Sequence, residues 1–269
     1  MIATYHNHSK WSDGKTTFRE IYDYAKKIGV DEVGLSDHLC IYPDGTSPGW
    51  SLDPIEVKEY LIEVLSFKDR GEISIRVGLE YDWFEGHSEL IGPIAEKIPL
   101  DYRIGAVHHV NQEQFDVNVE YWAEKSPEER DGIWKKYWLE IAEMASSGLF
   151  DMVAHLDLPK KLGFYPKSDM SSYIDNALEA IRESKMVVEL NTAGFGKKCA
   201  SGYPSIDILK MCRCKEIPIT LSSDSHSPEH ILFEFEKGLS RLKESGYKKL
   251  ARFREREVWF ESLDDALKK

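Results

Sequence analysis

The stretch Ile2-Ala3-Thr4-Tyr5-His6-Asn7-His8 opens the chain, and Asp224-Ser225-His226 follows its last strand-like run. Successive side chains of a β-strand alternate between two faces, so residues two apart point the same way. The two histidines of the first stretch can therefore approach one metal ion together, as can the Asp and His of the second. A lone H-x-H pair is common for ordinary hydrogen-bonding reasons, so the pattern gains meaning only from the other strands.

Short β-branched runs alternate with amphipathic helical patterns along the whole chain, which is typical of βα units and a parallel sheet. We predict seven strands, at residues 2–8, 32–38, 73–81, 102–110, 152–156, 186–191 and 218–223. No Gly/Ser/Pro linker or repeat divides the 269 residues. The pattern therefore predicts an α/β fold in a single domain over residues 1–269.

A helical insertion at about 113–148 separates the fourth and fifth predicted strands. It contains Trp122, Trp134 and Trp138. Aromatic residues at helical spacing usually belong to the core or to a helix packed on a barrel. A lid over the site or a contact between subunits is the alternative.

Composition excludes several classes of protein. Lys and Arg total 35 against 47 Asp and Glu, a net charge of −12, whereas proteins that grip nucleic acid are normally basic. No apolar run approaches the roughly 18 residues of a membrane span, and no secretory signal opens the chain. The four cysteines lack the spacing of a zinc site, so we expect buried thiols in a reducing cytoplasm.

Residues that can bind metals or transfer protons stand at the C-terminal end of every predicted strand. In β/α barrels these ends form the open mouth, where catalytic groups collect. The residues are His6, His8, Asp37, His38, Glu80, His108, His109, His155, Asp157, Glu189, Asn191, Asp224 and His226. Chance does not readily produce such a set, so we predict a metal site at the mouth of a barrel.

With these residues in place, the chain resembles the polymerase and histidinol phosphatase (PHP) superfamily of metal-dependent phosphoesterases over essentially its full length. The motifs that carry the resemblance are His6-Asn7-His8, Ser12-Asp13-Gly14, Ser36-Asp37-His38, Gly78-Leu79-Glu80, Gly105-Ala106-Val107-His108, His155-Leu156-Asp157 and Ser223-Asp224-Ser225-His226. The resemblance implies a distorted (β/α)7 TIM-like barrel with two or three divalent ions, usually zinc, iron or manganese.

Four segments, at 102–108, 150–161, 188–194 and 203–230, are most similar to histidinol-phosphate phosphatases. This second likeness implies a phosphomonoesterase of histidine biosynthesis, which hydrolyses L-histidinol phosphate to L-histidinol and phosphate. The implied partner is a small phosphorylated substrate, with no nucleic acid or membrane. The sequence does not predict an oligomeric state.

The resemblance also implies a ligand set. The first metal would be bound by His6, His8, Glu80 and Asp224. Glu80 would bridge to a second metal, held by His108 and His155. A third metal would use Asp13, His38 and His226. Some relatives carry His near position 13, so the occupancy of the third site stays open.

Such a site generates its own nucleophile. Two metals can share a bridging water whose pKa falls toward about 7, and the resulting hydroxide attacks phosphorus in line. The departing oxygen needs a proton, for which Asp224 and His226 are the candidate donors. Glu80 is the third residue with an expected catalytic role, as the bridge between the metals.

The expected substrate contacts are less well defined. Lys160, Lys161, Lys197 and Lys198 follow the fifth and sixth strands and could hold a phosphate oxygen, and His87 lies in a loop near the mouth. Candidates for reading an imidazole and an amine are Tyr42, Trp50, Asp157, Phe164 and Tyr165, which the sequence does not rank. His109 should point away from the barrel interior if His108 points inward. We expect His230 to be solvated.

Three other functions remain open. A related phosphoesterase could act on a nucleotide, a sugar phosphate or an oligonucleotide end, although the acidic charge disfavours the last. An amidohydrolase also begins with H-x-H, but it would carry a bridging lysine on the fourth strand. A non-catalytic metal-binding protein would explain the ligands but not their place at a barrel mouth.

Overall fold

The computed structural model describes residues 1–68 and 70–265. Seven parallel strands form one sheet in the order β1-β2-β4-β5-β8-β9-β10, and the short β3 (His38–Leu39) also pairs with β4. The seven strands are β1 (Ala3–Thr4), β2 (Glu32–Leu35), β4 (Ser74–Asp82), β5 (Tyr102–Ala106), β8 (Met152–Val153), β9 (Val187–Asn191) and β10 (Ile219–Ser222). Each of them lies within one residue of a range that the sequence pattern predicts.

The sheet curves until its two edges meet just beyond β1 and β10. The backbone N–H of His8 donates to the carbonyl of Ser225 at 2.7 Å, and the N–H of Ser225 donates to the carbonyl of His6 at 3.2 Å. These bonds form a parallel bridge between Asn7 and Ser225. The prediction of an α/β fold with a distorted seven-stranded barrel is therefore confirmed.

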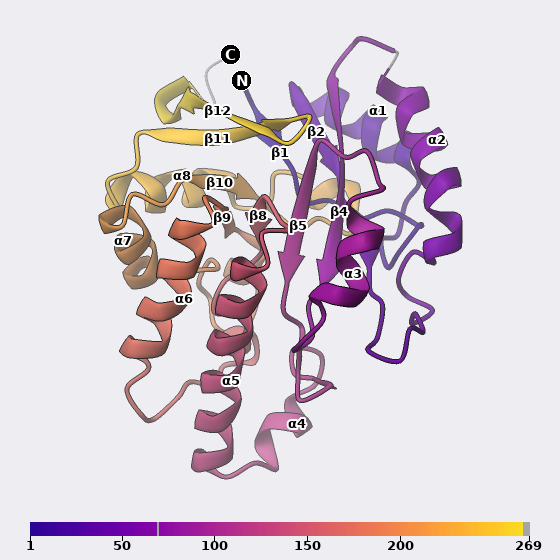
Figure 1. The fold of residues 1–269 in the computed structure, drawn as a ribbon. Helices are drawn as coiled ribbons and strands as arrows, with labels where there is room; N and C mark the ends of the chain where they lie inside the picture. The colour runs from indigo at the N-terminus through magenta and orange to yellow at the C-terminus, as the bar shows by residue number, and fades with distance from the viewer. Residues whose placement is uncertain (69, 266–269) are drawn as a thin grey trace.

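Helices form the outer layer around this barrel (Figure 1). They are α1 (Phe18–Ile28), α2 (Val57–Lys68), α3 (Ser88–Ala95), α4 (Val119–Ala123), α5 (Pro127–Ser146), α6 (Ser171–Glu183), α7 (Ile206–Cys214) and α8 (Phe235–Glu244). Short 3-10 helices span Pro54–Glu56, Leu158–Leu162, Ala193–Gly196, Pro228–His230 and Leu263–Asp265. Local sequence sets their ends: Ser126 and Glu129 form a capping box at the start of α5, which satisfies N–H groups that a helix leaves unpaired.

The segment 113–148 contains β7 (Glu113–Gln114), which pairs with β6 (His109–Val110), followed by α4 and α5. Helix α5 lies beside α6 on the outside of the barrel (Figure 1). All three tryptophans of the segment 113–148 are buried in the main core, and the indole N–H of Trp122 donates to the carbonyl of Phe115 at 2.7 Å. The side chains thus pack as core residues.

A C-terminal antiparallel hairpin, β11 (Lys249–Arg254) with β12 (Glu257–Ser262), is absent from the sequence-based prediction. It crosses the barrel at the end where the strands begin (Figure 1). The ring of Phe253 packs edge-on against Tyr5 at 5.1 Å and also contacts Tyr102. The hairpin therefore closes the N-terminal end of the barrel and leaves the opposite end as the mouth.

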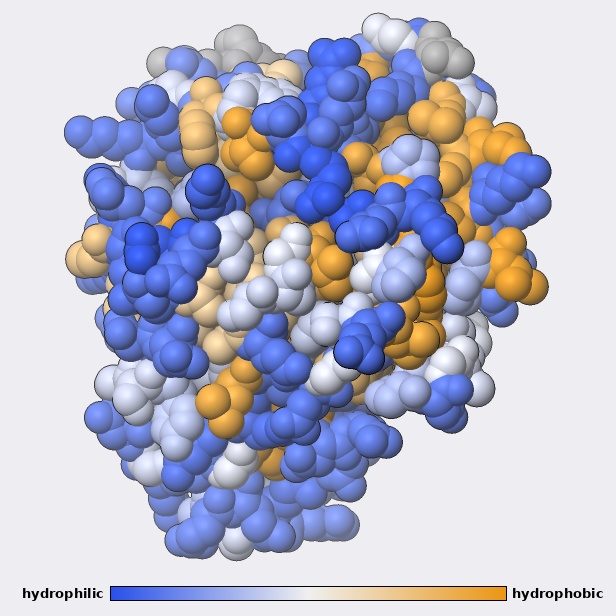
Figure 2. Space-filling model, in the orientation of Figure 1, coloured by the Kyte–Doolittle hydropathy of each residue, from blue (hydrophilic) through white to orange (hydrophobic). Residues whose placement is uncertain are grey.

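The surface is mixed in polarity. Most of the face in Figure 2 is hydrophilic, with hydrophobic side chains gathered on the side where α2 lies. Ile55, Ile62 and Leu65 are the exposed hydrophobic residues of that region. Within the described residues, no helix is long and apolar enough to cross a membrane. Cys40 and Cys212 are buried, but Cys214 is exposed, so the expectation that all the thiols are buried is wrong.

Candidate metal centre

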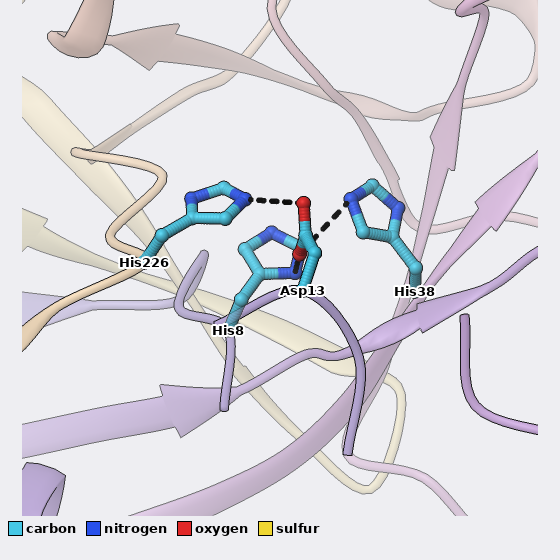
Figure 3. A group of neighbouring side chains, drawn as sticks. All are labelled: His8, Asp13, His38 and His226. Carbon is cyan, nitrogen blue, oxygen red and sulfur yellow. Dashed lines mark hydrogen bonds and ion pairs between the residues drawn. The ribbon is translucent and has the colours of Figure 1, made fainter. Parts of the chain in front are cut away.

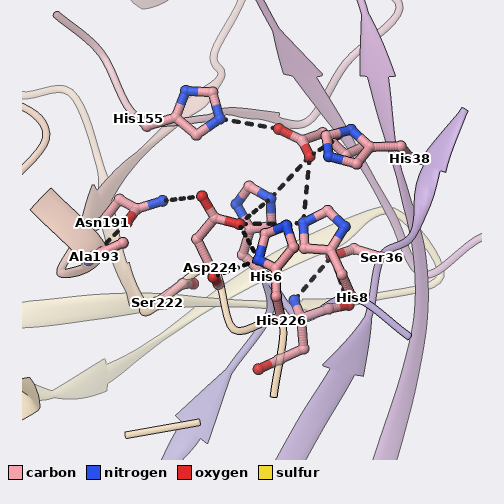
Figure 4. Close-up of polar contacts among 12 residues, drawn as sticks. His6, His8, Ser36, His38, His155, Asn191, Ala193, Ser222, Asp224 and His226 are labelled. Carbon is pink, nitrogen blue, oxygen red and sulfur yellow. Dashed lines mark hydrogen bonds and ion pairs between the residues drawn. The ribbon is translucent and has the colours of Figure 1, made fainter. Parts of the chain in front are cut away.

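Most of the predicted metal ligands meet in one cluster at the C-terminal ends of the strands (Figure 4). The positions of the ligands follow the topology: His6 and His8 follow β1, His38 begins β3, Glu80 lies in β4, His108 follows β5, His155 follows β8, and Asp224 and His226 follow β10. Asp13 comes from the loop between β1 and α1. Parallel strands bring these distant residues together because all their C-terminal ends face one mouth.

Glu80 occupies the centre of the cluster. Its Oε2 lies 3.1 Å from His6 Nε2, 3.4 Å from His8 Nε2 and 3.1 Å from His38 Nδ1. Its Oε1 lies 3.0 Å from His155 Nε2. The carboxylate thus contacts His6, His8 and His38 through one oxygen and His155 through the other.

Several atoms of the cluster are buried without a hydrogen-bond partner in the described structure. They are His6 Nε2, His8 Nε2, His38 Nδ1 and Glu80 Oε2. In addition, His108 Nε2 and His155 Nε2 point at each other across 3.2 Å. Buried polar atoms are nearly always satisfied, and facing ring nitrogens are natural ligands for a cation. The donor set therefore fits metal ions.

The ligand atoms form four overlapping groups, each within 4.8 Å: His8, Asp13, His38 and His226; His6, Glu80 and His155; His6, His8 and Asp224; and His38, Asp82 and His108. In the first group, the rings of His8, His38 and His226 surround Asp13 (Figure 3). His226 Nε2 lies 3.1 Å from Asp13 Oδ2. Apart from the exposed Asp13, the residues of these groups are buried or half-buried, and each group mixes imidazole with carboxylate, which suits zinc, iron or manganese.

Asp82 belongs to the cluster but was missed by the sequence-based prediction. It lies in β4, two residues beyond Glu80, and its Oδ1 is 2.9 Å from His108 Nδ1. The same period-two rule that singles out His6 and His8 applies to Glu80 and Asp82. That spacing is the signal that could have identified it.

Glu189 and Asn191, at the end of β9, form hydrogen bonds to the proposed metal ligands. Glu189 Oε1 is 2.9 Å from His6 Nδ1, and its Oε2 accepts the backbone N–H of His155 at 2.9 Å. The Asn191 amide donates to Asp224 Oδ2 at 3.3 Å. Such partners fix the tautomer and orientation of metal ligands. Sequence reading placed both residues at the mouth without giving them a role.

The carboxylates control the charge of the imidazoles in the metal-free cluster. Burial lowers the pKa of His38, but Glu80 and Asp82 outweigh it and raise this pKa to about 9. Burial also lowers the pKa of His108, but Asp82 outweighs this effect and raises the pKa to about 10. Burial lowers the pKa of His8 to about 4. A metal must therefore displace protons at His38 and His108, and its binding strengthens as the pH rises.

Backbone strain concentrates at the same strand ends. His155, Asp157 and Asp224 have φ angles of 22°, 61° and 52°, in the region that side chains other than glycine seldom adopt. Such conformations cost about 1–3 kcal/mol each and persist where the surroundings fix them. Here they turn the chain at the mouth, where His155 and Asp224 join the cluster.

Two cavities open beside the cluster. The acidic cavity, of about 270 Å³, is lined by Asp13, His38, Trp50, Glu80, His108, Gln114, Asp116, Val117, Lys161, Asp224 and His226. The cationic cavity, of about 540 Å³, is lined by Lys15, Leu158, Lys161, Ala193, Gly196, Lys197, Tyr203, Ser223, Asp224, His226, His230 and Phe233. Lys161, Asp224 and His226 line both, so the two cavities meet at the cluster.

The four lysines proposed for phosphate binding lie in different places. Lys161 lines both cavities, and its Nζ donates to Asp116 Oδ2 at 2.6 Å. Lys197 lines the cationic cavity, and the neighbouring Lys198 lines neither. Lys160 is buried, and its Nζ donates to Asp157 Oδ2 and to the carbonyl of Gly202, each at 2.8 Å. The ammonium group of Lys160 is thus hydrogen-bonded to loops near the mouth of the barrel.

We expect Lys160→Met to destabilise the protein by about 3–5 kcal/mol, because it leaves the buried Asp157 carboxylate without its cation. Denaturant unfolding measures this loss. Lys161→Met is the matched control, because the Nζ of Lys161 pairs with Asp116 where the two cavities meet. This change should affect the kinetic constants much more than the free energy of unfolding. Equal stability of the wild type and Lys160→Met would contradict the structural role of Lys160.

The remaining histidines lie outside the cluster. His87 is buried against Trp83 and Phe84 at the start of α3 and lines neither cavity. His109 is buried between Phe84 and Tyr42, and its Nδ1 lies 3.7 Å from Oδ2 of Asp82, so its ring is not turned fully away from the cluster in the way that the alternation rule predicts. His230 is exposed and lines the cationic cavity.

The five candidates for substrate recognition also lie in different places. Trp50 lines the acidic cavity, with its ring 5.2 Å from that of His38. Phe164 stacks on Trp122 at 5.7 Å, and Tyr165 is exposed. Tyr42, as described, packs beside His109, and Asp157 pairs with Lys160. Trp50 is therefore the candidate that lies beside the cluster, together with Asp116, which sequence reading missed.

Comparisons with known proteins agree with this geometry. A family model described as the PHP domain matches residues 4–193. A probable histidinol-phosphatase of Deinococcus radiodurans is 30% identical over 86% of this chain and 88% of its own. A histidinol-phosphatase of Bacillus subtilis is 27% identical over 84% of this chain and 92% of its own.

A solved structure shows the same fold. It is the histidinol phosphate phosphatase of Lactococcus lactis subsp. lactis, complexed with zinc, L-histidinol and phosphate. Its TM-score is 0.80 at 22% identity, and the match covers 96% of this chain and 98% of that one. The family model and the Deinococcus relative together span most of the chain. The protein therefore belongs to the PHP family, as an enzyme homologous to histidinol-phosphatases.

Proposed function

We propose that this protein is a metal-dependent phosphomonoesterase that hydrolyses L-histidinol phosphate to L-histidinol and phosphate. The observation that carries the proposal is the buried cluster of imidazole and carboxylate groups around Glu80, which lies where two cavities meet. The relatives named histidinol-phosphatase support the substrate, at 30% identity or below.

The residues fit two or three divalent ions of zinc, iron or manganese. His6, His8, Glu80 and Asp224 would hold the first ion, and Glu80, His108 and His155 the second. Asp13, His38 and His226 would hold a third, and their arrangement around Asp13 supports this use of the aspartate (Figure 3). When bound, the ions would supply positive charge to the phosphoryl oxygens and a water of lowered pKa.

The protein's own groups would position the substrate and move the proton. Lys161, at the junction of the cavities, would donate to a phosphoryl oxygen. Burial opposes ionisation of Asp224, but His6 and His8 hold its pKa well below the ordinary value. The pKa of His226 is raised, against burial, by its contact with Asp13. Of the two candidate donors, His226 would therefore carry the proton for the departing oxygen in an enzyme that holds two ions and leaves the third site empty.

The acidic cavity suits the leaving group. Histidinol carries an imidazole and a protonated amine, which favour aromatic and carboxylate partners. Trp50 and Asp116 supply these on the walls of this cavity. Lys161, against the opposing effect of burial, keeps the pKa of Asp116 low, so that this carboxylate is charged.

We expect L-histidinol phosphate to exceed nucleoside monophosphates and sugar phosphates in kcat/KM by at least about tenfold, or about 1.4 kcal/mol of discrimination in the transition state. The phosphate contacts are common to every ester, so the preference must arise in the acidic cavity. A screen of the metal-loaded protein against a panel of phosphate esters measures it. Asp116→Asn should reduce the ratio of kcat/KM for L-histidinol phosphate to kcat/KM for the other esters. Glu143→Gln on the outer helix α5 should leave this ratio unchanged.

A nucleotide or sugar phosphate hydrolysed as efficiently would overturn the assignment to histidine biosynthesis. The barrel and the metal cluster would remain, and the protein would then be a PHP phosphoesterase of another substrate. Metal binding without turnover of any ester on the panel would instead favour a non-catalytic metal-binding protein.

A further inference from the structure

The proposed function uses the acidic cavity and leaves the larger cationic cavity unexplained. Its basic side chains are Lys15, Lys161, Lys197, His226 and His230. Among the side chains of the described residues that line it, Asp224 is the one carboxylate. A positive wall of this kind is unexpected in a chain with a net charge of −12. A protonated amine such as that of histidinol would be repelled from it.

Two of these cations form no ion pair with the described residues. Within residues 1–68 and 70–265, no carboxylate lies within 4.0 Å of the ammonium group of Lys15 or Lys197. By contrast, Lys160 and Lys161 in the same region are both paired. The exposed charges of Lys15 and Lys197 are therefore available to a ligand.

The two lysines reach the cavity from loops that are distant in sequence. Lys15 lies in the loop after β1, where its backbone N–H donates to the carbonyl of His226 at 2.9 Å. Lys197 directly follows the 3-10 helix Ala193–Gly196. Leu158, Tyr203 and Phe233 are among the other residues that line this cavity and supply apolar surface. This combination fits a short carbon skeleton that ends in an anion.

We propose that the cationic cavity binds a second anionic group of a ligand whose phosphoryl group lies at the metal centre. The protein would then also act on phosphate monoesters whose leaving group carries a carboxylate or a second phosphate. This inference rests on the proposed function only in taking the cluster as the phosphoryl site. The substrate class itself differs from histidinol phosphate, because the two leaving groups carry opposite charge and would occupy different cavities.

Phosphonates test the inference without depending on turnover, because hydrolysis does not cleave their C–P bond. The probes are 3-phosphonopropionate and 4-phosphonobutyrate, each matched to a neutral partner of equal chain length, n-propylphosphonate or n-butylphosphonate. Titration calorimetry with the zinc-loaded protein gives the four dissociation constants. We expect at least one carboxylated probe to bind about tenfold or more tightly than its partner, and about 0.5 M salt to reduce this ratio.

Substitutions test whether Lys15 and Lys197 cause the tighter binding of the carboxylated probes. Lys15→Gln combined with Lys197→Gln should bring the ratio of dissociation constants close to one. Lys10→Gln is the matched control: this exposed lysine lies in the same loop as Lys15 but does not line the cavity, so the ratio should persist. Circular dichroism checks that each variant is folded.

Ratios near one for both pairs in the wild type would overturn the inference, as would a ratio that survives in the double variant. Turnover of L-histidinol phosphate by the same preparation reports separately on the proposed function. A strong ratio without that turnover would reject the proposed substrate and leave the cationic cavity as an anion site. Turnover without the ratio would reject only the anion site.

Discussion

Glu80→Gln should lower kcat by at least about a hundredfold, because it removes the anionic bridge at the centre of the metal cluster. The Glu80 carboxylate contacts three ring nitrogens through Oε2 and a fourth through Oε1, as the distances above show. An amide of the same shape offers one neutral oxygen and an N–H that would face ring nitrogens. Steady-state kinetics, together with metal analysis of the purified variant, measure the loss.

Two controls separate this effect from general damage to the fold. Glu140→Gln makes the same chemical change at a buried glutamate of α5, away from the cluster, and should leave kcat within about twofold. His109→Asn alters the histidine next to His108, but its ring faces Phe84 and Tyr42. Equal losses at Glu80 and Glu140 would contradict a specific role for Glu80 at the metal cluster. Equal losses at His108 and His109 would show that the inward face of this strand is assigned wrongly.

Removal of metal should abolish turnover completely while the barrel remains folded. The ligands lie at the mouth, whereas the main core is formed by apolar side chains between the strands and the helices. In the metal-free protein, ion pairs such as those of His38 and His108 with Glu80 and Asp82 replace the metal contacts. Chelation, verified by metal analysis, followed by circular dichroism and an activity assay tests this. Full activity in a verified metal-free sample would contradict the proposed mechanism.

The metal-free protein should also show a specific dependence of stability on pH. The folded-state pKa values of His38 and His108, about 9 and about 10, exceed the ordinary value of 6.5. Their contribution to the free energy of unfolding is therefore complete below pH 6.5 and is lost as the pH rises through 9 to 10. Denaturant unfolding across this range measures it. The metal-loaded protein, in which these rings bind metal, should not show the same loss.

Strand periodicity was sufficient to predict much of the architecture. The seven strands and the alternating helices follow from short β-branched runs and from helical spacing, which are local properties of the chain. Alternation also separates the surroundings of His108, which joins the cluster, from those of His109, which packs between Phe84 and Tyr42. The antiparallel hairpin β11–β12 was missed because charged residues such as Arg252 interrupt its apolar pattern. Arg252 is nevertheless buried, with its guanidinium paired to Glu261 and bonded to the carbonyl of Met1.

By itself, the sequence determined the chemistry of the centre, because imidazoles and carboxylates at the ends of parallel strands must meet at one mouth. Only the tertiary structure decided how the remaining residues are used. Lys160 and Lys161 are neighbours in the chain, yet one is buried in an ion pair and the other lines both cavities. The different sets of charged groups that line the two cavities likewise depend on loops that are distant in sequence. Local patterns fix which way a strand residue points, but the packing of loops fixes which charges are paired and which face a ligand.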